Sequence, residues 1–356
     1  MWAIQVFATL AALVAGTAID AVVAKPLHAG LNYHRYLEER EQTRAEVEEY
    51  LKSSAFKYAS ENGIWARDQE ARDGEPTEDE MQRFHMAKDA IKDLERSNPD
   101  AEFSTDSPFT FLTVEEFSKK MTPAGLNATV MSAPPADTPV SPHQREPTKD
   151  CKFEVDWKAK GCISPIKNQG QCGSCWAFAA IAAIESAQCV KGMPLRQYSE
   201  QQLMSCDRKN KGCQGGSPTL AMDYVKNNGL CAETDAPYKG SESCPTCSPV
   251  QISIQSLRQL EQKDTALANA VRKQPVTVLV ASGNNAWKQY KGGILSTCET
   301  TRLDHAVLVY GFSADSYLVK NSWGTWWGEK GFLRMRRNPE GMGTCNMYQS
   351  MMYPEL

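Results

Sequence analysis

The chain has 356 residues, of which 41% are hydrophobic and 23% charged, so it can bury an ordinary core and has room for about two domains. This composition excludes a fibrous or wholly disordered protein. The net charge is −4, but residues 1–150 carry −10, whereas residues 151–356 carry +6, with 23 Lys and Arg against 17 Asp and Glu. The basic residues of the second half are scattered and form no stripe with aromatic residues, so we expect no nucleic-acid partner.

The chain begins with an apolar run, residues 4–18, that is too short to span a membrane and ends in small residues. We interpret residues 1–24 as a secretory signal peptide, cleaved after Ala18 or Ala24. The alternative is a buried N-terminal strand or helix. No other stretch reaches 18 apolar residues, so we expect the mature protein not to enter a membrane.

Residues 25–133 are charged and have helical periodicity. The pattern predicts one helix from Tyr33 to Tyr58, with Val47, Tyr50, Leu51 and Ser54 on one stripe, and a second from Thr77 to Asn98, with acidic residues in its first turn. The run Phe109–Leu112 is a strand candidate. Residues 134–150 form a proline-rich linker, and the glycosylation sequon at Asn127 precedes it.

Beyond the linker, the pattern is first helical and then β-like. We expect helices at Ser174–Ala187, from Ser199 onward and at Thr219–Asn227. From Pro275 onward, short apolar runs predict strands at 276–280, 306–310, 317–320 and 332–335. Residues 151–356 therefore form one α+β domain with a helical half and a β half, and ligand sites tend to lie between such lobes.

All twelve cysteines lie in this domain, at positions 151, 162, 172, 175, 189, 206, 213, 231, 244, 247, 298 and 345. Disulfides at this density indicate an oxidising compartment. Two CxxC pairs, Cys172 with Cys175 and Cys244 with Cys247, could suggest zinc, but they stand about 70 residues apart with no histidine nearby. We therefore expect no metal site, while a redox role for Cys172 and Cys175 stays open.

Two residues are candidates for nucleophilic catalysis. Cys175 begins a strongly helix-forming run, and a helix N-terminus lowers the pKa of a thiol and favours the nucleophilic thiolate. His305 is the one histidine of residues 151–356, so an imidazole base in this domain has to be His305. A lone histidine of this kind could equally be a hydrogen-bonded core residue.

The segment Asn168-Gln-Gly-Gln-Cys-Gly-Ser-Cys-Trp-Ala-Phe resembles the active-site stretch of the papain-like cysteine peptidases. His305 follows Cys175 by 130 residues, and Asn321 follows His305 by 16, both in the order of that family. The resemblance covers about residues 153–354 and implies the papain-like two-lobe fold, with the active-site cleft between the lobes.

The resemblance also implies a role for each matching residue. Cys175 would be the nucleophile, His305 its base in a thiolate–imidazolium pair, Asn321 the group that orients the imidazole, and Trp323 the shield of that contact. Gln169 and the backbone N–H of Cys175 would form the oxyanion hole. Gly215 and Gly216 would pair with the substrate backbone. The remaining subsite residues would be Pro218, Leu279, Leu303, Asp304, Ala306 and Ser350.

The resemblance implies disulfides 172–213, 206–244 and 298–345, with 231–247 as an additional bridge, although Cys244 and Cys247 could exchange roles. It leaves Cys151, Cys162 and Cys189 unassigned. The spacing Asp79-x3-Arg83-x3-Ala87-x2-Ala90-x3-Leu94-x3-Asn98 resembles the inhibitory propeptide of the same family. Residues 25–133 would then be that propeptide, with the linker 134–150 crossing the cleft of a peptidase domain at 151–356.

The sequence thus predicts a secreted or lysosomal/vacuolar cysteine endopeptidase, made as a zymogen, with no cofactor and an apolar preference two residues before the scissile bond. The expected partners are peptide substrates, its own propeptide and cystatin-type inhibitors, and the expected state is a monomer. The opposite charges of the two halves predict activation by acid, accelerated by salt. The alternatives are a binding module that has lost catalysis and a disulfide oxidoreductase.

Overall fold

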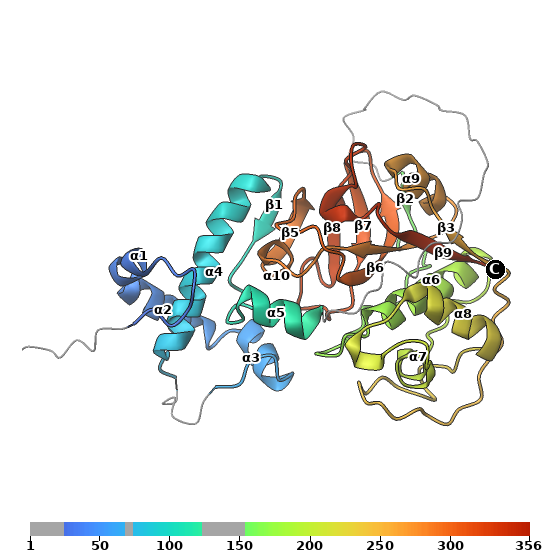
Figure 1. Ribbon diagram of the computed structural model, residues 1–356, viewed down its shortest axis with the longest axis horizontal. Coiled ribbons are helices and arrows are strands. Elements are labelled where there is room, and N and C mark those ends of the chain that lie inside the picture. The colour runs from blue at the N-terminus through green and yellow to red at the C-terminus, as the bar shows by residue number, and fades with distance from the viewer. Residues whose placement is uncertain (1–24, 68–73, 123–153) are drawn as a thin grey trace, which may run out of the picture.

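The computed structural model describes residues 25–67, 74–122 and 154–356. The expected signal peptide, the sequon at Asn127, the proline-rich linker and Cys151 lie outside the described residues. Figure 1 shows two parts: a helical N-terminal segment (residues 25–67 and 74–122, blue to cyan), and a C-terminal domain (residues 154–356). In that domain, green and yellow helices lie beside a sheet drawn in orange and red.

The N-terminal segment consists of short helices around one long helix. Its elements are α1 (Tyr33–Glu38), α2 (Arg40–Tyr50), α3 (Ser54–Glu61), α4 (Glu78–Ser97), β1 (Ala101–Phe103) and α5 (Val114–Met121). The expected single helix from Tyr33 to Tyr58 is wrong, because the chain turns after Tyr50 and Ser53 caps a new helix by accepting from the Phe56 amide at 3.1 Å. As a result Ser54, expected on the apolar stripe, is exposed.

The long helix α4 agrees with the prediction to within a residue at each end. Thr77 and Glu80 form a capping box, in which each side chain accepts from the other residue's backbone amide, at 3.1 and 2.9 Å. Its apolar face packs Met81 and Phe84 against Val47, Tyr50 and Phe111. This small core is separate from the cores of the C-terminal domain.

The strand expected at Phe109–Leu112 is wrong: these residues form a turn, and the strand of this region is β1. The two aromatic rings of the turn belong to different cores. Phe111 packs edge-on against Tyr50 inside the N-terminal segment, with ring centroids 4.9 Å apart, whereas Phe109 packs against Trp323 of the C-terminal domain at 5.9 Å. In a strand, Phe109 and Phe111 would lie on one face, whereas here they enter two different cores.

The helical lobe of the C-terminal domain is built around one central helix. Its helices are α6 (Cys175–Val190), α7 (Glu200–Cys206) and α8 (Pro218–Asn228). Every residue of α6 from Cys175 to Gln188 is buried, because α7, α8 and the strand β6 all pack against this helix. The predicted helices of this half are confirmed.

The β lobe holds an antiparallel sheet with one parallel pair, β5 with β8. Its strands are β2 (Val155–Asp156), β3 (Ser256–Gln259), β4 (Val276–Val280), β5 (Tyr290–Leu295), β6 (His305–Phe312), β7 (Ser316–Lys320), β8 (Phe332–Arg336) and β9 (Met351–Glu355). The order is β1-β5-β8-β7-β6-β4-β9-β3, with β2 beside β6. Two short helices flank the sheet, α9 (Asp264–Val271) and α10 (Asn285–Lys288). The four expected strands are confirmed as β4, β6, β7 and β8.

Five disulfides cross-link the C-terminal domain. Four are those that the resemblance implied, 172–213, 206–244, 231–247 and 298–345, and the fifth joins Cys162 to Cys189. Cys175 is the free cysteine among the described residues. The pairing of Cys172 with Cys213 excludes a Cys172–Cys175 redox couple in this state.

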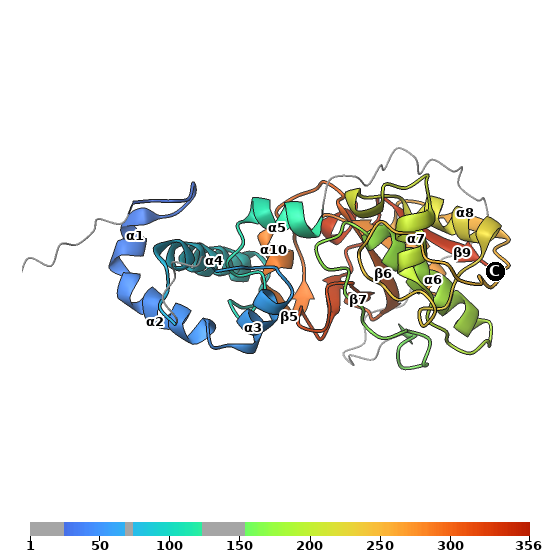
Figure 2. The same cartoon turned by 90° about the horizontal axis from the view of Figure 1, so that it is seen from below.

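The N-terminal segment joins the domain by extending its sheet. Strand β1 pairs antiparallel with β5, with Ala101 opposite Gly293. Figure 2 shows α5 and α10 side by side at this junction. Asn98, at the end of α4, accepts the Ser296 and Thr297 backbone amides at 2.9 and 2.7 Å. Among the described residues, no helix has the length and apolar character needed to cross a membrane.

Candidate active site

Cys175 lies at the N-terminal end of α6, directly after the N-cap residue Ser174. Its side chain is 3% exposed and belongs to an apolar cluster that joins the two lobes. The Ala306 backbone is hydrogen-bonded to the Cys175 sulfur, and the thiol therefore lies next to the beginning of β6. The residue before Ala306 is His305, so the two candidate catalytic residues come from the two lobes, on the elements α6 and β6 that pack against each other.

His305 is fully buried and hydrogen-bonded through one ring nitrogen. Its Nε2 lies 2.7 Å from Asn321 Oδ1, while Nδ1 has no hydrogen-bond partner among the described residues. Asn321 Oδ1 also accepts the Ser322 amide at 2.8 Å, so it acts as an acceptor and Nε2 donates. Trp323 stacks on the imidazole with ring centroids 4.7 Å apart. This tautomer leaves Nδ1 with a lone pair that can accept a proton.

The expected thiolate–imidazolium pair stays a prediction for the uncovered enzyme, and burial opposes it while the site is covered. Burial raises the pKa of Cys175 to about 12, and it lowers the pKa of His305 to about 4. The backbone amides of Cys175 and Trp176 do favour the thiolate, as a helix N-terminus should, but loss of hydration outweighs them. Burial therefore favours the neutral form of both groups while the N-terminal segment covers them.

Gln169 is 1% exposed and contacts Cys172, which lies two residues before Ser174, the N-cap residue of α6. Its Nε2 donates to the Cys172 carbonyl at 2.9 Å and to the Met121 carbonyl, at the end of α5, at 3.3 Å. Ser322 Oγ donates to Gln169 Oε1 at 2.7 Å, which fixes the orientation of the amide. A carbonyl oxygen of the N-terminal segment thus occupies the donor that sequence analysis assigned to the oxyanion hole.

Three of the expected subsite residues, Leu279, Leu303 and Ala306, share the apolar cluster of Cys175. Sequence analysis missed two further members, Ala179 and Met352. Met352 lies on β9, beside β4, and no local motif marks it: only the pairing of Thr277 with Met352 across the sheet brings it here.

The other expected subsite residues are placed less directly. Ser350 is buried, and its carbonyl accepts the Leu279 amide at 3.0 Å. Pro218 is the first residue of α8, whose next residue, Thr219, contacts Met352 Sδ at 3.0 Å. The Asp304 carboxylate accepts the Ser282 and Gly283 amides at 2.8 and 3.1 Å. It holds a loop of the domain, and a role in substrate binding stays a prediction.

Gly215 and Gly216 are required for different structural reasons. Gly215 has φ of 107°, which side chains rarely adopt. At Gly216, a Cβ atom would lie 2.5 Å from Asn210 Oδ1 and 2.7 Å from Trp176. The backbone conformation at Gly215 and the packing at Gly216 therefore each disfavour a side chain, whether or not a substrate backbone pairs with these residues.

The N-terminal segment covers this site with α5. The Phe117 ring packs edge-on against Trp323 at 5.5 Å, and Phe109 packs on the same tryptophan. Ser118 lies over Gly283, where a Cβ would be 2.7 Å from its Oγ. Within residues 25–67, 74–122 and 154–356, no group of three or more His, Cys, Asp or Glu side chains is arranged to hold a metal ion.

Comparisons with known proteins agree with this geometry. A model of the "Papain family cysteine protease" family matches residues 152–355. Caricain from Carica papaya is 34% identical over 293 residues, which cover 79% of this chain and 82% of caricain. The proform of the ragweed pollen allergen Amb a 11, a cysteine protease, has a TM-score of 0.73 and 26% identity, covering 90% of this chain and 87% of the other. Bromelain from Ananas comosus, solved with the E64 inhibitor, has a TM-score of 0.54 and 35% identity over 57% of this chain and 98% of its own.

The described N-terminal segment is matched along with the domain in the Amb a 11 proform, so the likeness extends to the precursor form of such a protease. A cysteine at a helix terminus, an imidazole held by an asparagine and a covering helix are combined in one chain. On the extent of the family match and of the likeness to caricain, this chain belongs to the papain family of cysteine proteases and is a cysteine endopeptidase in its proform.

Proposed function

We propose that Cys175 and His305 cleave peptide bonds by acyl transfer, after the N-terminal segment has left the site. The observation that carries this proposal is the hydrogen bond of 2.7 Å between His305 Nε2 and Asn321 Oδ1, which leaves Nδ1 free to act as a base. His305 directly precedes Ala306, whose backbone contacts Cys175, the one free thiol of the described chain. Rehydration on opening lowers the pKa of Cys175 and raises that of His305, so that the proton moves from sulfur to imidazole.

The Cys175 thiolate then attacks the substrate carbonyl carbon, and the negative charge moves to the carbonyl oxygen. Gln169 Nε2 and the Cys175 amide donate to that oxygen, and removing one such donor typically costs about 3 kcal/mol of barrier lowering. The imidazolium gives its proton to the leaving amine, which breaks the peptide bond and leaves a thioester. Water, deprotonated by His305, hydrolyses the thioester and restores the thiol.

We further propose that the cluster of Leu279, Leu303, Ala306 and Met352 receives an apolar side chain, Leu, Val or Phe, two residues before the scissile bond. Asp304 is tied to Ser282 and Gly283, which disfavours an arginine there. We also propose that residues 25–133 inhibit the peptidase domain 151–356, which the covering of the site by α5 supports. The five disulfides support passage through an oxidising secretory or vacuolar compartment.

The test compares the full chain with Cys175→Ala after acidification. Wild type is expected to yield a processed enzyme that hydrolyses a peptide library and prefers apolar residues two positions before the scissile bond. Iodoacetamide is expected to label Cys175 in this enzyme. Cys175→Ala is expected to stay intact, with under about a thousandth of the activity, because no other group supplies the nucleophile. Asn321→Ala serves as the comparison, since it orients the base and is expected to lose less. Hydrolysis by Cys175→Ala, or labelling of another cysteine, contradicts the proposal.

A further inference from the structure

Lys288, the last residue of α10, is a buried lysine at the junction of the two parts, where Figure 1 shows α10 beside α5 and β5. Its side chain is 3% exposed, although lysine is almost never fully buried without a partner. Its Nζ donates to the Leu112 carbonyl at 2.6 Å, and Ser107 Oγ donates to the Lys288 carbonyl at 3.0 Å. Both contacts come from the N-terminal segment.

The charges that act on Lys288 also belong mostly to that segment. Burial lowers its pKa to about 8, and the charged groups acting on it are Glu299, Arg83, Glu116 and Glu115. Of these, Glu299 alone lies in the C-terminal domain, and its carboxylate already accepts from Asn285 Nδ2 at 3.1 Å and the Ala286 amide at 3.0 Å. When the segment leaves, Lys288 loses its hydrogen-bond acceptor and the burial that lowers its pKa, without gaining a free carboxylate.

The position of Lys288 relative to the reacting groups follows from its neighbour Trp287. The Trp287 ring packs edge-on against His305 at 5.9 Å and against Trp323 at 5.7 Å. The apolar cluster of Leu279 and Leu303, proposed for the acyl part of the substrate, lies instead at Cys175. The part of the cleft over Trp323 and Trp287, now filled by residues 112–117, is left for the leaving part of the substrate.

We propose that, in the processed enzyme, the Lys288 ammonium binds an Asp or Glu side chain of the substrate in the first two residues after the scissile bond. The Leu112 carbonyl oxygen stands where an oxygen of that carboxylate would bind. A partly desolvated ammonium with no carboxylate of its own selects an acidic group by charge. This inference rests on the proposed peptidase function and names a substrate preference at the same site.

The test uses the processed enzyme, obtained from the full chain by acidification, and three amidated peptides with Leu at the second position before the scissile bond. The first peptide carries Glu, and the second Gln, at the first position after the scissile bond. The third carries Glu at the second position after this bond. We expect the better Glu peptide to have a kcat/KM about three- to tenfold above that of the Gln peptide at pH 6. The ratio is taken within each variant, so that any change in overall activity cancels.

Lys288→Gln is expected to reduce this ratio to about one. Lys291→Gln is the matched control, because Lys291 is an exposed lysine three residues away that pairs with Asp106, and it is expected to keep the ratio. A ratio of one in wild type, or a preference that survives in Lys288→Gln, overturns the proposal. The proposal is also overturned if kcat/KM rises only when the Gln peptide ends in a free C-terminal carboxylate, because Lys288 would then bind the substrate terminus.

The outcome is separable from failure of the peptidase function, which the Gln peptide reports by itself. If no peptide is cleaved, fluorescence anisotropy of labelled, amidated tripeptides beginning with Glu or Gln measures the same preference as a ratio of dissociation constants. Tighter binding of the Glu tripeptide that is lost in Lys288→Gln supports the proposal, and equal binding overturns it.

Discussion

At the residue scale, the site is held inactive by loss of hydration and by single hydrogen bonds. Burial raises the pKa of Cys175 and so favours its thiol form, although the amides at the beginning of α6 favour the thiolate. The covering segment, in turn, is held in register by groups such as Asn98, whose Oδ1 accepts two backbone amides of the C-terminal domain. Cys175 chemistry therefore reports how often the segment opens.

Replacing Asn98 with Ala is expected to leave the Ser296 and Thr297 amides without their acceptor and to weaken docking by about 1–2 kcal/mol. Iodoacetamide labelling of Cys175 in the full chain at pH 7 should then become about 5- to 30-fold faster. Asn98→Asp keeps an oxygen acceptor and should stay near wild type. Asn62→Ala, which removes a bond within the α3 region at Tyr58, is the control. Unchanged labelling in Asn98→Ala would show that these bonds do not hold the segment.

At the element scale, α4 and α5 are tied together by one arginine. Arg83 pairs with Asp79 at 2.8 Å and with Glu116 at 2.5 Å, donates to the Phe111 carbonyl at 3.0 Å and lies over Trp65. Burial by itself would raise the pKa of Glu116, but the hydrogen bonds from Arg83 and the Thr113 amide hold it below its usual value. Glu116 therefore stabilises the segment above the pKa of a free glutamate, and this stabilisation is lost as the pH falls through the folded value.

Arg83→Gln is expected to destabilise the N-terminal segment by about 2–4 kcal/mol, because it leaves two carboxylates and a carbonyl without their partner. Thermal unfolding by calorimetry in a Cys175→Ala background measures this without self-cleavage. The variant should also open at a higher pH than wild type. Arg44→Gln breaks an exposed pair with Glu48 and is expected to change stability by under about 0.5 kcal/mol. Equal effects of the two variants would refute the role of Arg83.

Local patterns predicted those elements whose stability is local. The capping box at Thr77, the apolar spacing of α4 and the continuous apolar strands β4 and β6 are visible in short windows of sequence. Strand β1 was not predictable in this way, because its partner β5 lies about 190 residues further along the chain. Likewise, Phe109 and Phe111 alternate as in a strand but enter different cores. The core of Phe111 lies within the segment, and that of Phe109 is shared with the domain on which the segment docks.

The active-site residues show the same division. Cys175, His305, Asn321 and Gln169 follow from motif and order, and the structure brings their elements together. The raised pKa of Cys175 did not follow from the sequence, since a helix terminus is a local signal whereas burial under α5 is not. Lys288 carries no motif at all, and its acceptor, Leu112, is 176 residues away.

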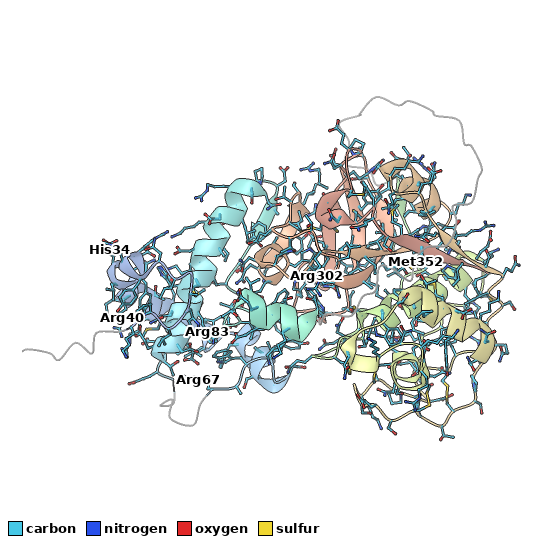
Figure 3. The ribbon with its side chains drawn as sticks, viewed as in Figure 1. His34, Arg40, Arg67, Arg83, Arg302 and Met352 are labelled. Atoms are coloured by element: carbon cyan, nitrogen blue, oxygen red, sulfur yellow. A yellow bond between two sulfur atoms is a disulfide. The ribbon has the colours of Figure 1, made fainter. Side chains whose placement is uncertain are left out.

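At the scale of the whole molecule, the opposite charges of the two halves are mostly not in contact. Among the described residues, two ion pairs join the segment to the domain, Lys291 with Asp106 and Arg336 with Asp100, and their acidic partners are exposed. Figure 3 shows Arg40, Arg67 and Arg83 within the segment, where they pair with its own carboxylates. The sequence-based expectation that net attraction holds the segment is therefore not supported by its contacts.

The structure accordingly predicts a small effect of salt. Raising NaCl from 0.05 to about 0.5 M at pH 4.5 should change the rate of self-processing by less than about twofold, because exposed pairs contribute little and backbone and aromatic contacts are unscreened. Lowering the pH at fixed salt should accelerate it far more, through Glu116 and its neighbours. The appearance of the processed enzyme on gels measures both rates. A tenfold acceleration by salt alone would restore the charge-based explanation.

The pairing of β1 with β5 has a consequence for the life of the enzyme after processing. While the segment is bound, β5 is an interior strand of the sheet, and the Ile294 amide donates to the Asp100 carbonyl at 2.6 Å. Once β1 leaves, β5 becomes an edge whose backbone groups can template the strand of another molecule. Gly293, with φ of 78°, bends that edge, and Lys291 places a charge on it, so the features that accommodate β1 also discourage aggregation once the edge is bare.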